Sequence, residues 1–129
     1  MSTFILIGLG GILGANARFW ISQWTADRYG VAFPYGTFVV NASGSCVMGL
    51  ILTLFSGRTL ESPEARYLVA TGFLGAYTTF STFAYETVAL VRQAEVRLAL
   101  INLLGTTVVG VIGAIFGSRV GEALVSWGA

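Results

Sequence analysis

The chain has 129 residues, of which 55% are hydrophobic and 10% are charged. Soluble domains carry about a quarter of charged residues, so this composition excludes a water-facing globule and favours a lipid environment. There is no His, and all seven basic residues are Arg, which excludes a His-ligated metal and a Lys Schiff base. The net charge of +1 without a basic block excludes nucleic acid as a partner.

Apolar segments of about 20 residues are long enough to cross a bilayer as helices. The short connections, at 26–30 with Pro34 beyond, at 57–63 and at 92–95, predict that sequential helices are antiparallel. We therefore predict an all-α membrane protein, with 1–129 as a single domain of four transmembrane helices. The predicted spans are 4–24, 31–55, 67–91 and 98–125.

Glycines recur at steps of four in the first and fourth segments. Gly10 and Gly14 form one such ladder, and Gly113, Gly117 and Gly121 form the other. Small residues at this spacing let helix backbones approach closely, either within one subunit or between two. Because four helices are too few to enclose a large substrate cavity, we expect an oligomer.

Arg residues in the short loops decide how a membrane protein is oriented. Here the two sides nearly balance, so we hypothesise that the chain inserts in both orientations and pairs with an inverted copy of itself. A uniformly oriented protein with a weak bias is the alternative. One side collects Arg58, Arg66 and Arg119, and the other collects Arg28, Arg92 and Arg97, with Arg18 if it snorkels outward.

The third segment carries two glycines and a run of hydroxyl residues between 71 and 83, which favours helix poorly. We predict a break near 75–79. Irregular backbone is tolerated at membrane depth only inside protein or beside a wet cavity. The freed carbonyls of 75–78 could coordinate a small hard cation such as sodium. A kink satisfied by neighbouring helices is the alternative.

Phe80 and Phe83 are three residues apart and share a helix face, with Ser81 and Thr82 turned elsewhere. Two Phe on one face usually pack against other helices. Ring edges are electropositive, however, so rings presented edge-on beside hydroxyls could line a site for a small anion.

Thr37, Asn41 and Ser45 follow one another at steps of four in the second segment, where Asn41 is costly in lipid. Its amide could replace water around an anion or join helices. Asn102 and Thr106, followed by Gly110, repeat the spacing in the fourth segment. They form the opposite wall of a narrow path, or Asn102 lies near an interface and Thr106 bonds to its own backbone.

Charged residues also lie inside the first and third predicted spans, namely Arg18 and Glu86. Arg18 lies about six residues, or roughly 9 Å, inside the end of the first span, where it serves an anion vestibule or snorkels beside Trp24. Glu86 follows Phe83 by one turn and meets an Arg or accepts donors at a pore mouth.

These residues together resemble the bacterial CrcB/Fluc fluoride channel family over essentially the whole chain. The resemblance lies in the stretches 10–19 and 36–44, in Gly75 with 78–83 and Glu86, and in the glycine-rich fourth segment. It implies an antiparallel, dual-topology homodimer in the bacterial inner membrane, with two fluoride pores and a structural sodium ion at the dimer axis. The implied role is passive export of cytoplasmic fluoride.

The resemblance also implies roles for individual residues. Asn41 would donate to fluoride, Phe80 and Phe83 would supply ring edges, and Ser81 and Thr82 would extend the polar path. Gly75 and Thr78 would offer backbone oxygens to sodium. The family's fourth-helix polar track often begins with Tyr and continues through Ser, whereas the matching positions here are Asn102, Thr106 and Gly110.

A small dual-topology, proton-coupled multidrug transporter is the alternative function. Such a protein needs an acid deep in its first helix, and the first span contains Arg18 as its one charge. An intramembrane enzyme is disfavoured because the chain lacks His and a deep pair of acids.

Overall fold

The computed structural model describes residues 2–56 and 62–127, and every regular element in these ranges is helical. Three helical stretches are long and apolar enough to cross a membrane, which confirms the first, second and fourth predicted spans. They are α1 (Thr3–Tyr29), α2 (Tyr35–Ser56), and the continuous run of α6 (Val96–Leu100), η2 (Ile101–Gly105) and α7 (Thr106–Trp127).

The segment predicted at 67–91 is built from shorter pieces. The first three follow one another without a gap, and η1 has wide π-helical turns. The pieces are α3 (Pro63–Arg66), η1 (Tyr67–Leu74), α4 (Gly75–Tyr77) and α5 (Phe80–Arg92).

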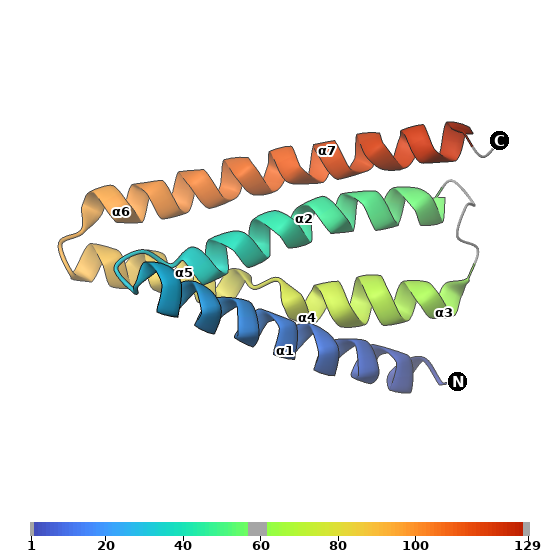
Figure 1. Cartoon of the computed structure of the whole chain (residues 1–129), viewed down its shortest axis with the longest axis horizontal. Helices are drawn as coiled ribbons and strands as arrows, with labels where there is room; N and C mark the ends of the chain where they lie inside the picture. The colour runs from blue at the N-terminus through green and yellow to red at the C-terminus, as the bar shows by residue number, and fades with distance from the viewer. Residues whose placement is uncertain (1, 57–61, 128–129) are drawn as a thin grey trace.

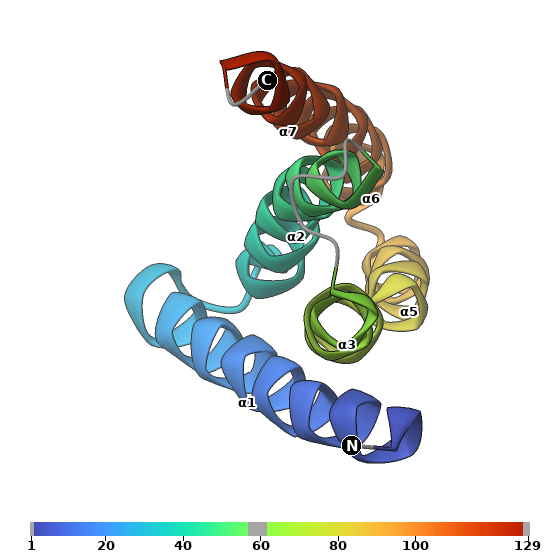
Figure 2. The ribbon, with the colours of Figure 1, turned by 90° about the vertical axis from the view of Figure 1, so that its right-hand side faces the viewer.

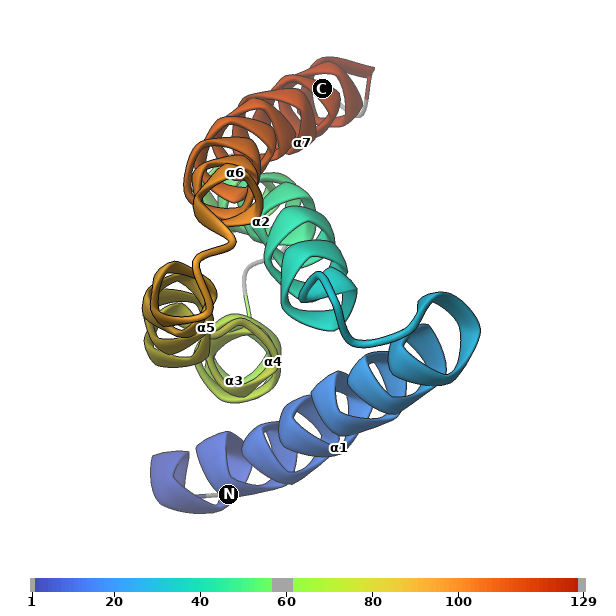
Figure 3. The same cartoon turned by 90° about the vertical axis from the view of Figure 1, so that its left-hand side faces the viewer.

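Consecutive long segments run in opposite directions along the bundle, as the short connections predict (Figure 1). Seen from either end, α7 lies at one edge and α2 lies next to it, while α3 and α4 lie between α2 and α1 with α5 to their side (Figures 2 and 3). As a result, α2 runs parallel to α7, and α1 runs parallel to η1.

The first connection is shorter than predicted. Residues 26–29 are helical and extend α1 to Tyr29, because Ala and Arg are good helix formers and Arg28 lies favourably in the last turn. Gly30 ends the helix with a positive φ of 79°, which glycine adopts without a steric penalty. Arg18 therefore lies about 16 Å from the end of α1, not 9 Å, by the rise of an α-helix.

Both glycine ladders pack helices within the subunit. A Cβ at Gly10 would collide with the carbonyl of Leu68, and one at Gly14 would collide with the carbonyl of Phe73. In the other ladder, a Cβ at Gly117 would collide with the Cys46 carbonyl. These faces are covered by the chain's own backbone, so of the two alternatives the ladders serve packing within one subunit.

The buried core is small and lies where α2 meets the η1–α4 segment. Val40, Leu74 and Tyr77 form its centre, and partly buried Ile21 and Phe73 pack against it. Most large apolar side chains instead point outward, Trp20 and Phe116 among them. An apolar exterior around a small core is typical of a protein whose solvent is lipid.

Candidate functional site

Extended backbone separates α4 from α5. Thr78 has ψ 156° and Thr79 has φ −149°. The irregular backbone is shorter than the predicted 75–79, because Gly75 is helical, with φ −62° and ψ −36°. The next helix begins at once, because the Thr79 hydroxyl oxygen caps α5 by accepting the N–H of Thr82 at 3.3 Å.

The side chain of Asn41 binds the backbone of Thr79 at both polar groups. Its Nδ2 donates to the Thr79 carbonyl at 3.0 Å, and its Oδ1 accepts the Thr79 N–H at 2.8 Å. Thr79 is buried, and buried backbone groups without partners are costly. One amide on α2 therefore replaces helical hydrogen bonds that the extended residues have lost, and it keeps one N–H for another acceptor.

Neighbouring residues of α2 hold the end of α4. The hydroxyls of Ser43 and Tyr77 are hydrogen-bonded at 2.9 Å. Gly44 lies so close to the break that a Cβ there would collide with the Thr78 methyl group. The turn of α2 from Asn41 to Gly44 thus holds residues 77–79 in place, and Phe80 follows them directly.

Phe80 and Phe83 lie on one side of α5, as their spacing predicts. Their ring centroids are 5.9 Å apart, and the ring planes are inclined at 52°. Phe80 is 80% exposed in the single chain, whereas Phe83 is 7% exposed. Ser81 and Thr82 are also exposed. The start of α5 therefore presents one free ring and two hydroxyls to whatever surrounds the subunit.

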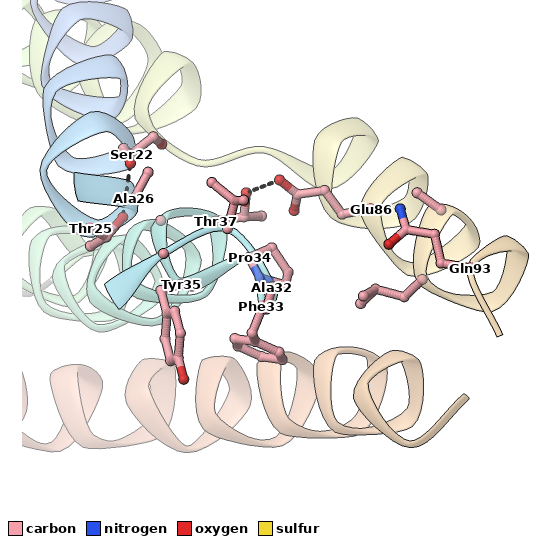
Figure 4. A pocket seen from close by; sticks show the side chains of 15 residues that line it. Ser22, Thr25, Ala26, Ala32, Phe33, Pro34, Tyr35, Thr37, Glu86 and Gln93 are labelled. Carbon is pink, nitrogen blue, oxygen red and sulfur yellow. Dashed lines mark hydrogen bonds between the residues drawn. The ribbon is translucent and has the colours of Figure 1, made fainter. Parts of the chain in front are cut away.

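A pocket of about 270 Å³ lies at the end of the bundle where α1 connects to α2. Thr37 from α2 and Glu86 from α5 lie side by side in its lining, and Ser22 and Thr25 come from α1 (Figure 4). The Thr37 hydroxyl donates to Oε1 of Glu86 at 2.9 Å. Of the two partners left open for Glu86, the residues that the structure describes thus supply a hydroxyl donor, and no Arg among them pairs with it.

Asn102 and Thr106 are buried and bonded to each other. The Thr106 hydroxyl donates to Oδ1 of Asn102 at 3.2 Å, and Nδ2 of Asn102 donates to the Thr87 hydroxyl at 2.9 Å. Thr106 therefore bonds to a side chain and not to its own backbone, which was one of the alternatives. The pair links η2 and the start of α7 to α5.

The structure brings together most of the predicted site residues around the break. The first turn of α5 carries Phe80, Ser81, Thr82 and Phe83, and Asn41 lies beside it. Thr37 lies one turn of α2 away from Asn41. Arg18 is partly buried on α1, and no ion pair to it is present in the described ranges.

Sequence reasoning missed two partners, Thr79 and Thr87. Thr79 belongs to the hydroxyl run that signalled the break, and the preference of Thr for helix N-caps could have identified it. Thr87 carries no signal in the sequence, because its role depends on how closely η2 packs against α5.

Comparison with known proteins agrees with this architecture. Residues 5–118 match the family model described as CrcB-like protein, Camphor Resistance (CrcB). A protein of Chloroflexus aurantiacus named "Fluoride-specific ion channel FluC" is 42% identical over 122 residues, covering 95% of this chain and 97% of that protein.

Two further proteins with the same name are similar over nearly their full length. The one from Acidobacterium capsulatum is 38% identical over 123 residues, with coverage of 95% and 98%. The one from Trichormus variabilis is 44% identical over 125 residues, with coverage of 93% and 91%.

Three helical stretches long and apolar enough to cross a membrane, with mostly exposed apolar side chains, define a multi-pass membrane protein. The chain belongs to the CrcB-like family, which confirms the resemblance identified from the sequence.

Proposed function

We propose that the protein is a fluoride-selective channel through which cytoplasmic fluoride leaves the cell passively. Its relatives are named fluoride-specific ion channels, and the family contains channels and not enzymes. In this proposal, two inverted copies form a dimer with two pores in the bacterial inner membrane. The pieces α3 to α5 form the remaining membrane crossing, interrupted at Thr78 and Thr79.

The polar line along α2 is the observation that carries the proposal. Thr37 opens into the end pocket, and one turn further Asn41 meets the break. Polar atoms in lipid are costly, so a line of them across an apolar helix indicates an ion route. The Asn41 N–H that is not bonded to Thr79 is the donor available to an anion.

Phe80 is the ring we place against fluoride. Its ring is exposed at the start of α5, beside the hydroxyls of Ser81 and Thr82. Electropositive ring edges and hydroxyl donors bind an anion weakly, and weak binding at several sites is what conduction requires. Phe83, which is buried in the single chain, supports this ring, and Arg18 draws anions toward the vestibule.

The backbone carbonyls of Gly75 and Thr78 fit the proposed sodium site because they have lost their usual helical N–H partners. In a continuous helix these carbonyls would accept the N–H groups of Thr79 and Thr82. Those two N–H groups bond to Asn41 and to the Thr79 hydroxyl instead. Oxygen ligands suit a hard cation, and two backbone oxygens per chain call for a second copy to complete the coordination.

Dual topology is supported by where the described Arg residues lie. Arg28, Arg92 and Arg97 are at the end of the bundle with the α1–α2 connection, while Arg66 and Arg119 are toward the other end. Arg58, which entered the sequence count, lies outside the described residues.

Asn102 and Thr106 form the far wall of the path in this proposal. Both side chains are buried in the single chain, so they support this wall from behind by positioning α5 through Thr87.

Fluoride efflux from liposomes tests the function. The purified protein should pass fluoride down its gradient with little chloride leak. Equal leak of fluoride and chloride would disprove the proposed function. The multidrug alternative is not favoured by the relatives, and proton-driven uptake of a cationic dye by the same liposomes would revive it.

A further inference from the structure

A groove of about 500 Å³ runs along α2 on the far side of Asn41 from the end pocket. Ser45 lies at its head, one turn beyond Asn41, so the groove continues the line of Thr37, Asn41 and Ser45. Half of its lining residues carry hydroxyls, namely Ser45, Thr53, Ser56, Thr78 and Ser118.

An anion needs hydrogen-bond donors, and each hydroxyl has one hydrogen to give. Four of the five hydroxyls donate that hydrogen to backbone carbonyls. Within the ranges 2–56 and 62–127, the Ser45 hydroxyl has no hydrogen-bond partner. The committed donors are Thr53 to Gly49 at 2.8 Å, Ser56 to Leu52 at 2.9 Å, Thr78 to Leu74 at 3.0 Å and Ser118 to Gly49 at 3.4 Å.

The free hydroxyl of Ser45 faces Gly110 on α7, the position at which the four-residue series of polar side chains on η2 and α7 ends. Asn102 and Thr106 are followed, at the same step of four, by Gly110, which has no side chain. A Cβ built on Gly110 would lie 3.5 Å from Oγ of Ser45, at ordinary contact distance. The two four-residue series, one on α2 and one on η2–α7, therefore converge at Ser45 and Gly110.

We propose that Ser45 binds the permeating anion and supplies, from α2, the hydroxyl that Gly110 does not supply from α7. The role rests on the proposed function, because the anion is fluoride. Fluoride that has left Asn41 meets the Ser45 hydroxyl next, about 6 Å further along α2 by the helical rise. Gly110 leaves the space that this hydroxyl uses.

A hydroxyl exchange between the two helices tests the role. Ser45→Ala should slow fluoride efflux about tenfold, the factor expected for losing a hydrogen bond to a charged partner. The double variant Ser45→Ala/Gly110→Ser returns a hydroxyl from the other helix and should recover efflux to within about threefold of the unmodified protein. A Ser at 110 fits because no atom lies closer than contact distance.

Ser56→Ala is the matched control. It removes a hydroxyl from the same groove, but one that already donates to its own helix, so efflux should stay within about twofold of the unmodified protein. Gel filtration of each variant before reconstitution establishes that assembly is unchanged.

The role is overturned by any of three results: full efflux in Ser45→Ala, no recovery in the double variant, or an equal loss in Ser56→Ala. Failure of the unmodified protein to pass fluoride is a separate result that overturns the proposed function and this role with it.

Discussion

Asn41 takes the N–H of Thr79 that would otherwise complete the last turn of α4. The two residues are joined by paired hydrogen bonds of 3.0 and 2.8 Å, and the N–H belongs, in a continuous helix, to the carbonyl of Gly75. One side chain thus keeps the backbone extended and leaves a carbonyl exposed for the proposed sodium ion.

Removing this amide should damage both assembly and flux. Asn41→Ala leaves two buried backbone groups without partners, which should cost about 2 kcal/mol of stability and reduce efflux at least about tenfold. Thermal unfolding in detergent and liposome efflux measure the two effects. Asn16→Ala is the control, since Asn16 bonds to its own helix on an exposed face. An unchanged unfolding temperature in Asn41→Ala would contradict the stabilising role of the Asn41–Thr79 hydrogen bonds.

Phe80→Ile and Phe83→Ile should differ in what they impair. Phe80 is exposed, so its replacement should slow fluoride flux while leaving the unfolding temperature unchanged. Phe83 is buried, so its replacement should also lower stability, by about 1 kcal/mol. Gel filtration, thermal unfolding and efflux separate the two outcomes. Undiminished flux in the double variant would rule out their proposed role in the pathway.

Gly117→Ala should prevent close packing of α7 on α2. The added methyl group would collide with the Cys46 carbonyl, and backbone cannot move aside cheaply, so we expect at least about 2 kcal/mol of destabilisation. Gly105→Ala makes the same change where the nearest atom, on Phe38, is 3.8 Å away, and it should be tolerated. Thermal unfolding compares the two. Equal stability would argue against the intrachain packing of this glycine.

Ala94→Gly should stabilise the protein. Ala94 has a φ of 62° in the turn after α5, where the Glu95 N–H bonds to the Leu90 carbonyl at 2.9 Å. This left-handed cap favours glycine, so a gain of about 1 kcal/mol is expected. Ala89→Gly, inside α5, should lose about as much, because glycine weakens a helix interior. A lower unfolding temperature for Ala94→Gly would contradict this account of the turn.

Fixing the orientation should abolish activity if inverted copies must pair. Several Lys added to one terminus should force one topology, and that variant expressed alone should pass no fluoride. Coexpression with a variant biased the opposite way should restore efflux. Full activity of either variant alone would disprove the dual-topology proposal.

The lengths and directions of the long helices could be predicted because the apolar runs are interrupted by charges and turn residues. The end of α1 was misplaced because Asp27 and Arg28 look like a loop, whereas local helix propensity carries the helix on to Gly30. The glycine ladders were identified correctly, but spacing alone does not say which helix fills the opposite side.

Within the site, Asn41 was singled out because its cost in lipid is visible in the sequence. Its partner was not, since the contact with Thr79 joins residues far apart in the chain and depends on how α2 crosses the break. The same reason hid the bond between Thr37 and Glu86. Polar residues can thus be recognised from type and spacing, but their pairing follows from tertiary packing.

The two parallel helix pairs, α1 with η1 and α2 with α7, are each locked by backbone contacts at glycine and have little capacity to deform. The Asn41 amide joins α2 to the extended backbone that follows η1 and α4, with ordinary hydrogen bonds. Bilayer thickness or tension that slides the pairs past each other would load these hydrogen bonds together with the close contact of Gly36 with Ser22, so the lipid composition of the host membrane would act mechanically on residues we place along the ion's route.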